Sequence, residues 1–473
     1  MVKKALLMLL VVSVMAAGAY SGGLALSGVG SKAIGMGGAF RGLADNWSAA
    51  YWNPAGLAQL AQTEINFMGI GINPIPQYTP TIRYGDYEVG YKNDQTRYPQ
   101  GKMHLAANAS GFYKMLSRED ITFGVALFVP YALGSSWDLF KPNYEDAAGE
   151  FPTWDHAADL RVIDIHPSIA KSFMDGKLML GAGMSIMRGS IEFRKTVLNA
   201  TTLPRPHDYL AVDAFLKGDG WGYGANFGVL YKLNDKLQVG LSGKTPTTLD
   251  ISGDVSNTLY TIDNIDLGNT ALSQAGSQEE IDLIYYIFSD ETRNWRNDAT
   301  AELKLPADAG LGFAYKASEK LLLTMDFSYT LWSSLDSIII DLDTAATGEA
   351  PPGEPTESMT IRTKWDDILR LSLGGQYQVS DRLECLFGFY YDPSPIPDET
   401  FSPLFMDIGT KYSGNLGASL EVNNWELGYN FEYIHFSSRD IPEDVTAGSD
   451  FDNYPGLFDA YLIANHLSIT YRF

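Results

Sequence analysis

The sequence predicts an all-β protein, a transmembrane antiparallel β-barrel of about 14 strands with a plug at the N-terminus. Three observations lead to this fold class. The chain begins with a segment that resembles an export signal, apolar and polar residues alternate through most of its length, and tight turns alternate with long connections. A closed barrel satisfies all of its backbone hydrogen bonds in lipid, so such a chain crosses a membrane without a long apolar helix.

Residues 1–19 have the composition of a secretory signal peptide. Lys3 and Lys4 precede an apolar stretch, and the small residues Ala17 and Ala19 form a cleavage site. The apolar stretch is shorter than the roughly 20 residues of a transmembrane helix. We therefore expect residues 1–19 to be removed on export.

The charge and the rare residue types argue against several classes of protein. The chain has 473 residues, with 57 Asp and Glu against 34 Lys and Arg, and this acidic balance argues against nucleic-acid binding. The single Cys385 cannot form an intramolecular disulfide. The 6 histidines lack the spacing of metal ligands, and His466 and Ser468 share a face that we expect to point inward. We therefore expect no metal, no cofactor and no enzymatic activity.

The alternation is clearest over residues 425–436. One face of this run carries the apolar residues Trp425, Leu427, Tyr429, Phe431 and Tyr433. Alternation alone is also compatible with a soluble sandwich. The runs commonly extend over ten or more residues, whereas strands of soluble proteins average about five or six, and this length favours a membrane barrel.

The runs and their connections give a strand count. Strands are expected near 63–79, 103–115, 119–134, 159–174, 177–195, 211–233, 236–253, 300–316, 319–340, 357–378, 382–392, 407–422, 424–437 and 459–473. The number is even, which suits a bacterial barrel over residues 63–473. External loops are expected near 80–102, 135–158, 196–210, 254–299, 341–356, 393–406 and 438–458, and the acidic part of the last fits a solvated loop better than a Ca²⁺ site.

The longest loop, 254–299, contains a predicted amphipathic helix. Ser277 and Glu280 have the spacing of a capping box. One face of the helix carries Ile281, Ile284, Ile287 and Phe288. Such a face needs a cover, either a neighbouring loop or an apolar ligand.

The N-terminal segment 20–62 does not alternate and is rich in Gly and Ala, which suits a plug inside a wide barrel. Its motifs GSKAIGMGGAF, Ala44-Asp45 and WNPAGL, the last including Asn53, Pro54 and Ala55, resemble the hatch of the FadL/TodX family of outer-membrane transporters for long-chain fatty acids and other hydrophobic compounds. Further motifs follow in the family's order: Trp221-Gly222-Tyr223-Gly224, Leu305-Pro306, Tyr329-Thr330-Leu331-Trp332-Ser333 and the run from Tyr391 to Asp398.

The resemblance implies a lateral exit through a kink in the third strand, which here contains Pro130, Tyr131 and Gly134. Pro130 has no N–H to donate to the strand ladder and Gly134 tolerates bent backbone, so the wall is expected to be weak there. The alternative is that Pro130 merely ends the strand at the external rim.

The resemblance also implies an Arg on the fifth strand that binds a carboxylate, at the position of Arg188. Alternation puts Arg188 on a face with Ser190 and Glu192, which we interpret as the lumen face. The family's partner Lys is replaced by Ile338 or Ile339, so a neutral hydrophobic ligand is equally consistent. The alternative role for Arg188 is a lumen charge paired with an acidic residue.

The hypothesis is therefore passive transport of long-chain fatty acids or hydrocarbons across the bacterial outer membrane, with capture at the loops, a lumen pocket and lateral exit. A general diffusion porin, or a surface adhesin or receptor, is the alternative. The expected partners are the hydrophobic molecule, membrane lipid and the insertion machinery, which reads a terminal Phe such as Phe473. The resemblance also implies a monomer.

Overall fold

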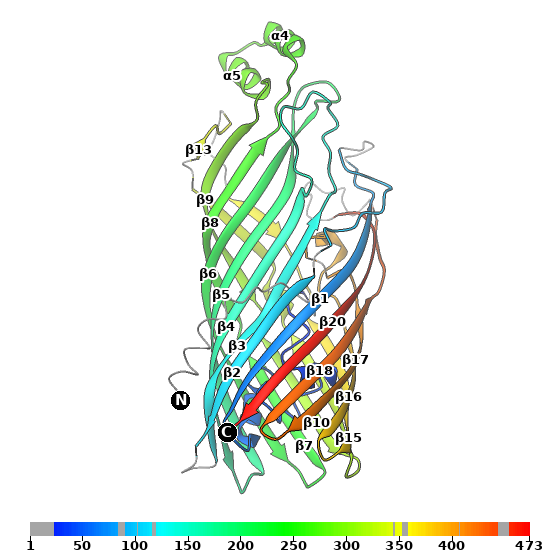
Figure 1. Cartoon of the computed structure of the whole chain (residues 1–473). Helices are drawn as coiled ribbons and strands as arrows, with labels where there is room; N and C mark the ends of the chain where they lie inside the picture. Colours follow the sequence, from blue (N-terminus) through cyan, green and yellow to red (C-terminus); the bar gives the residue numbers. More distant parts are fainter. Residues whose placement is uncertain are drawn as a thin grey trace.

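The computed structural model describes residues 23–83, 90–101, 103–115, 120–343, 346–351, 358–405, 407–442 and 454–473. Its strands form a closed antiparallel barrel with 14 strands in the wall (Figure 1). The first and last strands close the barrel over the register from Glu64↔Arg472 to Pro80↔Gly456. The predicted fold class is confirmed, while the predicted signal peptide lies outside the described residues.

Ten of the described wall strands are continuous. They are β1 (Glu64–Pro80), β2 (His104–Lys114), β3 (Ile121–Trp137), β4 (His156–Phe173), β5 (Leu178–Ala200), β6 (Tyr209–Lys232), β16 (Leu383–Asp392), β17 (Lys411–Val422), β18 (Trp425–Phe436) and β20 (Gly456–Arg472).

Each of the other four wall strands consists of two segments. The pairs of segments are β7 (Leu237–Lys244) with β8 (Thr247–Leu259), β9 (Arg293–Leu305) with β10 (Asp308–Lys316), β11 (Leu321–Thr330) with β12 (Ser337–Leu342), and β14 (Met359–Arg362) with β15 (Ile368–Ser380). Alternation predicted each pair as one uninterrupted strand. The interruptions coincide with Pro246 and Pro306 and with buried Trp332 and Trp365, which the period-two pattern does not distinguish from strand residues.

The remaining elements are short. Inside the barrel lie α2 (Ser31–Gly35), α3 (Ala49–Trp52) and η1 (Pro54–Gln59), and the connections carry α4 (Ile265–Gln274), α5 (Gln278–Ile287), η2 (Trp332–Ser334), η3 (Asp398–Thr400), β13 (Thr347–Gly348) and β19 (Arg439–Ile441). None of the helices in the described part of the chain is both long and apolar enough to cross a membrane.

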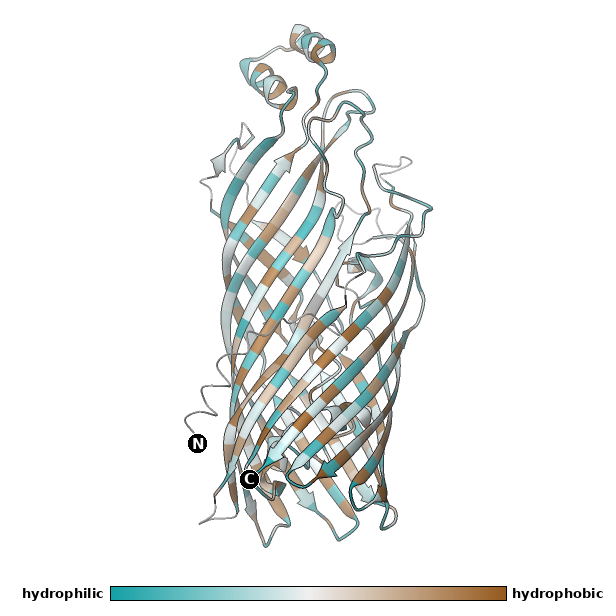
Figure 2. Ribbon diagram, viewed as in Figure 1, coloured by the Kyte–Doolittle hydropathy of each residue, from teal (hydrophilic) through white to brown (hydrophobic). Residues whose placement is uncertain are grey.

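The two faces of the wall differ as alternation predicts. On β18, Trp425 and Tyr433 point outward and are exposed, whereas Asn430, Glu432 and Ile434 point inward and are buried. Brown and teal residues alternate along the lower strands in Figure 2. The outward row meets lipid, and the inward row packs against the N-terminal segment.

The wall is taller on one side than on the other. β5 and β6 have 23 and 24 residues, whereas β16, β17 and β18 have 10, 12 and 12. At about 3.3 Å per residue and a tilt of roughly 40°, β5 rises about 60 Å, well beyond an apolar band of about 25 Å. The outer face of β5 changes accordingly from exposed Leu180 and Met184 to the charged residues Arg188 and Glu192.

Residues 23–62 are packed inside the barrel, where α2 contacts β17 and β18 and η1 contacts β4 to β6. Arg41 pairs with Asp308 at 2.6 Å, and the backbone N–H groups of Phe40 and Arg41 donate to Asp326 at 2.8 and 2.6 Å. Carboxylates on the inner wall thus anchor this segment through its backbone.

Candidate functional site

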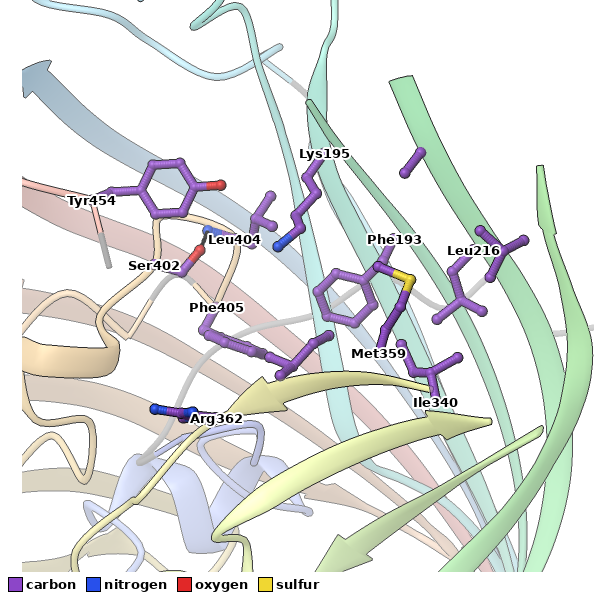
Figure 3. A pocket seen from close by; sticks show the side chains of 13 residues that line it. Phe193, Lys195, Leu216, Ile340, Met359, Arg362, Ser402, Leu404, Phe405 and Tyr454 are labelled. Carbon is purple, nitrogen blue, oxygen red and sulfur yellow. Dashed lines mark hydrogen bonds between the residues drawn. The ribbon is translucent and has the colours of Figure 1, made fainter. Parts of the chain in front are cut away.

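An apolar pocket lies in the upper lumen, between the tall wall and a connection that folds inward. Its lining is Phe193, Lys195, Ala214, Leu216, Val255, Ile340, Met359, Ile361, Arg362, Ser402, Leu404, Phe405 and Tyr454. Figure 3 shows the side chains of Phe193, Phe405 and Met359 converging on one space. The ring centroids of Phe193 and Phe405 are 5.9 Å apart. We name this space the lumen pocket.

Two cations belong to the lining of the lumen pocket. Lys195 comes from β5, and Arg362 is the last residue of β14, at its lower end (Figure 3). A pocket with apolar walls and a few charged groups orients an amphipathic ligand, and a guanidinium or ammonium group suits a carboxylate. Both residues were missed at the sequence level.

Arg188 does not belong to this pocket, and the prediction that it faces the lumen is wrong. It pairs with Asp219, its guanidinium lies 5.0 Å from the ring centroid of Trp221, and its side chain is 44% exposed. Its neighbours Met187 and Ile191 are the buried, inward residues. Above the membrane the outer face meets water while the inner face lines an apolar pocket, so the usual assignment of the polar row to the lumen is reversed there.

Residues 23–27, which we name the N-terminal strap, reach the lining of the lumen pocket through Trp365. A Cβ at Gly23 would be 2.7 Å from the Trp365 ring, whose centroid is 5.5 Å from that of Phe405. Leu26 N–H donates to Pro130 O at 3.0 Å, and Ala132 N–H donates to Leu24 O at 3.2 Å. The strap therefore acts as a short strand against one edge of β3. At its start, Gly23 N–H donates to the buried carboxylate of Asp407.

The edge of β3 accepts the strap because β2 pairs only with its lower part. The β2–β3 register runs from Ala109↔Leu127 to Lys114↔Thr122, and the β3–β4 register shifts between Phe128 and Tyr131. Pro130 lies within this shift, so the strand is irregular rather than simply ended there. Farther up, Gly134 lies against His104, whose ring would be 2.8 Å from an added Cβ.

The connection between β16 and β17 folds inward and links the lumen pocket to both the strap and β3. Its residues Leu404 and Phe405 line the pocket. Its carbonyl oxygens accept hydrogen bonds from β3, Ser135 Oγ donating to Leu404 O and Trp137 Nε1 to Pro403 O, both at 3.2 Å. Asp407, which holds the strap, forms a fully buried ion pair with Lys411 at 2.5 Å.

The hatch motif fixes the N-terminal segment to the wall below the strap. Asn53 Nδ2 donates to Arg41 O at 2.9 Å and to Val229 O at 3.1 Å, and Asn53 Oδ1 accepts from Ala55 N at 3.2 Å. Pro54 lies so close to β5 that a Cβ at Gly181 would be 2.3 Å from its carbonyl carbon. The motif therefore needs a wall glycine opposite it.

Charged residues line the lumen below the strap, among aromatic side chains that include Tyr51, Trp52 and Trp332. A second cavity there is lined by Arg41, Lys244, Asp308, Arg370 and Asp392, together with strap residues and Tyr131. Lys244 lies over the ring of Tyr51, 3.4 Å from its centroid. An apolar molecule leaving the lumen pocket downward would have to displace these charged groups from each other.

The predicted loop helix forms as α5, and its apolar face is partly covered. Ile287 is buried and Phe288 packs with it in a cluster over the upper ends of β6 and β8, whereas Ile281 and Ile284 are half-buried. The exposed apolar residues of the two loop helices are Ile265, Leu283 and Tyr285. Of the two covers considered for the apolar face of α5, a neighbouring loop and an apolar ligand, a neighbouring loop thus provides much of the contact.

Polar contacts also hold the loop helices. Asp146 accepts from His207 Nε2 at 2.7 Å and from Asn264 Nδ2 at 2.9 Å, and Asn264 also caps α4. Burial acts to raise the pKa of Asp146, but the hydrogen bonds from His207 and Asn264 outweigh it and lower the pKa below its usual value. Over the described ranges, no cluster of three His, Cys, Asp or Glu side chains could hold a metal ion.

Comparisons with known proteins agree with this architecture. The chain is 22% identical over 428 residues to an outer membrane protein of Neisseria meningitidis, covering 86% of this chain and 84% of that one. It is 24% identical over 217 residues to a long-chain fatty acid transport protein of Escherichia coli, covering 44% of this chain and 43% of that one.

Solved structures show the same fold at low identity. A FadL homologue of Pseudomonas aeruginosa superposes with a TM-score of 0.72 at 18% identity, covering 95% of this chain and all of that one, 100%. The toluene transporter TodX of Pseudomonas putida gives a TM-score of 0.69 at 14% identity, covering 94% and 99%.

A family model for outer membrane protein transport proteins (OMPP1/FadL/TodX) matches residues 12–473. The predicted outer-membrane location and the predicted family are confirmed, and the family is one of transport proteins rather than enzymes. The chain belongs to the OMPP1/FadL/TodX family of outer-membrane transport proteins.

Proposed function

We propose that the chain carries long-chain fatty acids, or hydrocarbons of similar size, passively across the outer membrane. The observation that supports this most is the contrast within the lumen, an apolar pocket above the strap and charged residues below it. Transfer of apolar surface out of water is favourable, so the pocket retains a hydrophobic molecule that the charged lower lumen rejects.

The proposed route has three steps. Exposed Leu283 and Tyr285, next to Ile281 and Ile284 of α5, first capture the molecule at the loop tips. The lumen pocket then binds it. It leaves sideways through the wall near Pro130, Tyr131 and Gly134 once the strap moves away from β3, because the hatch, including Asn53, Pro54 and Ala55, obstructs the axial path.

The two cations of the pocket favour a carboxylic acid over a neutral hydrocarbon. Lys195 and Arg362 take the place that the sequence assigned to Arg188. The test is uptake of a labelled C16 fatty acid and a labelled alkylbenzene by cells that rely on this chain. Lys195→Gln with Arg362→Gln is expected to slow uptake of the acid about tenfold, the equivalent of about 1.4 kcal/mol, and to leave the alkylbenzene unchanged.

The control is Lys217→Gln, an exposed outer-face cation that pairs with Glu192. Equal uptake of the acid by parent and double variant would reject the carboxylate assignment but not transport itself. Absence of uptake of either compound by the parent would reject the proposed function. A steady open conductance in planar bilayers would instead favour the diffusion porin, and uptake unaffected by deletion of the α4–α5 loop would reject capture at its tip.

Membrane insertion and assembly carry two further proposals. Phe473 is exposed at the end of β20, next to Tyr471 at a ring distance of 4.8 Å, where the insertion machinery could bind it. The barrel is proposed to act as a monomer.

A further inference from the structure

The cavity below the strap, which we name the lower cavity, combines charged groups with aromatic rings. The N-terminal segment, the strap and the wall strands β3, β7, β10, β11, β15 and β16 all contribute to it. Its aromatic members are Tyr51, Trp52, Tyr131 and Trp332. Its charged members are Arg41, Lys244, Asp308, Arg370 and Asp392. Aromatic walls with a few charged groups are typical of small-molecule sites, so the lower cavity is a second candidate site in the lumen.

Arg41 and Asp308 neutralise each other in this cavity. The guanidinium of Arg41 donates to Asp308 at 2.6 Å, and it also donates to Ser242 Oγ at 2.7 Å and to Ser328 Oγ at 3.1 Å. Asp308 is directly opposite Lys244 in the β7–β10 register, yet its ion pair is with Arg41. One carboxylate of the cavity is therefore taken by an arginine.

Arg370 and Asp392 form the second pair. Nη1 of Arg370 lies 3.9 Å from a carboxylate oxygen of Asp392, and the guanidinium lies 3.8 Å from the ring centroid of Tyr390. Asp392 is almost fully buried, so its charge needs this partner. Both carboxylates of the lower cavity are thus matched by arginines.

Lys244 is the third cation of the cavity, and within the described residues it forms no ion pair. Its Nζ lies instead over the ring of Tyr51, 3.4 Å from the centroid. Such a cation–π contact offsets only part of the cost of withdrawing an ammonium group from water. The lower cavity therefore carries three cations against two carboxylates, although the whole chain has 57 Asp and Glu against 34 Lys and Arg. The surplus positive charge favours an anion as the missing partner.

We propose that the lower cavity binds a small aromatic carboxylate, with Lys244 as the group that binds its charge. An ammonium group and a carboxylate form a strong, charge-assisted hydrogen bond, and the surrounding aromatic side chains pack against a ligand ring. An alkyl chain is rejected by the charged lining, and an anion without a ring leaves the aromatic side chains without a contact. The site does not rest on the proposed transport function.

A bound ligand of this kind connects two parts of the molecule. Tyr51 and Trp52 belong to α3 of the hatch, whereas Lys244 belongs to β7 and Trp332 to η2 of the wall. A carboxylate on Lys244 with its ring among these side chains would therefore join the hatch to the wall. The two lumen sites would then differ in ligand, with a hydrophobic chain above the strap and an aromatic anion below it.

Isothermal titration of the full-length barrel in detergent tests the ligand class with three probes. Benzoate has both the ring and the charge, benzyl alcohol has the ring alone, and acetate has the charge alone. Saturable binding of benzoate is expected, with the other two probes at least about tenfold weaker, the equivalent of about 1.4 kcal/mol. Benzyl alcohol binding as tightly as benzoate would overturn the role of the cation, and acetate doing so would overturn the role of the rings.

Substitution of Lys244 tests the assignment of the charge. Lys244→Gln is expected to weaken benzoate binding about tenfold, and Lys244→Arg is expected to restore it to within about threefold of the parent. The matched control is Lys304→Gln, which removes a lysine that is exposed on β9. Heat-modifiable migration on gels verifies folding. Equal affinity of the parent and Lys244→Gln, or an equal loss in Lys304→Gln, would overturn the assignment.

Crystals of the parent soaked with 4-iodobenzoate locate the site without any variant. An anomalous iodine peak is expected inside the lower cavity, among Tyr51, Lys244 and Trp332. A peak only in the lumen pocket, near Lys195 and Arg362, would overturn the lower site while supporting the carboxylate preference proposed for that pocket. No peak at either place and no saturable binding of benzoate would also overturn the lower site. Uptake of the C16 acid, a separate measurement, would then still decide the proposed function.

Discussion

The tall wall formed by β4 to β6 and the short wall formed by β16 to β18 follow the same alternation with opposite meaning. On the short wall, apolar Leu427 faces lipid and Glu432 faces the lumen. On the upper tall wall, Arg188 faces out and Ile191 faces in. The difference teaches that the pattern reports which solvent each face meets, and only below the membrane boundary is the outer solvent lipid.

The largest expected effect comes from placing the same charge on both walls. Leu416→Arg puts a cation in the middle of the lipid face of the short wall, where Leu416 is exposed on β17, and should destabilise the barrel by about 2–4 kcal/mol. Ser190→Arg puts it on the outer face of the upper tall wall and should change stability by less than about 0.5 kcal/mol. Urea unfolding in lipid vesicles measures both, and equal losses would break the comparison.

A smaller effect is expected from a neutral polar group on the inner face of the tall wall. Ile191 is 4% exposed, so Ile191→Asn buries an amide among apolar side chains and should cost about 1–3 kcal/mol. It should also slow uptake of a fatty acid. The neighbouring Ser190→Asn is the control, and a comparable cost for the two would mean that water fills this part of the lumen.

A pH effect should be confined to the crown of loops above the tall wall. The pKa of Asp146 is lower in the folded loops than its usual value near 4, so its bonds with His207 and Asn264 stabilise the loops above about pH 4. That contribution is lost as the pH falls through the folded pKa. Hydrogen exchange of α4 should accelerate below about pH 4 in the parent.

Asp146→Asn is the control for this pH effect, because it removes the titrating group. Its α4 should exchange faster than the parent's at neutral pH and show no further acceleration from this residue on acidification. Acceleration of the same size in parent and variant would assign the effect to other carboxylates.

The smallest expected effect is that of Arg188→Gln. The Arg188–Asp219 pair is exposed on the outer face, and exposed ion pairs contribute about 0–1 kcal/mol. Unfolding and uptake should therefore match the parent within error. A clear loss of fatty-acid uptake, with normal stability, would return Arg188 to the ligand pathway.

Much of the barrel could be predicted from the sequence because its wall repeats one local rule. Strand positions follow from a period of two that each residue obeys independently, so β18 (Trp425–Phe436) matches the expected strand within a residue or two. The break at Trp332 was not predicted, because a side chain that turns inward looks the same in a strand pattern. The break at Pro246 was missed although proline has no N–H for the strand ladder, a signal that the alternation overrode.

The candidate site was harder to predict because it depends on contacts between distant segments. Phe193 and Phe405 form one pocket although the chain between them crosses the membrane many times. Lys195 is two residues from Phe193 and seven from Arg188, so alternation along β5 puts it on the face of Phe193 and not on that of Arg188. This was the one local signal available. It could be interpreted only once the position of the membrane boundary on β5 was known.

The strap has a consequence for how the protein assembles. Gly23 is bonded to Asp407, 384 positions later, and Ser27 Oγ donates to Glu432 at 3.0 Å, 405 positions later. Neither partner is in place until nearly the whole wall has formed, and such distant pairings carry a large loop-closure cost. The strap, near the start of the chain, must therefore be among the last segments to dock, and the nascent barrel has an unsealed lumen until it does.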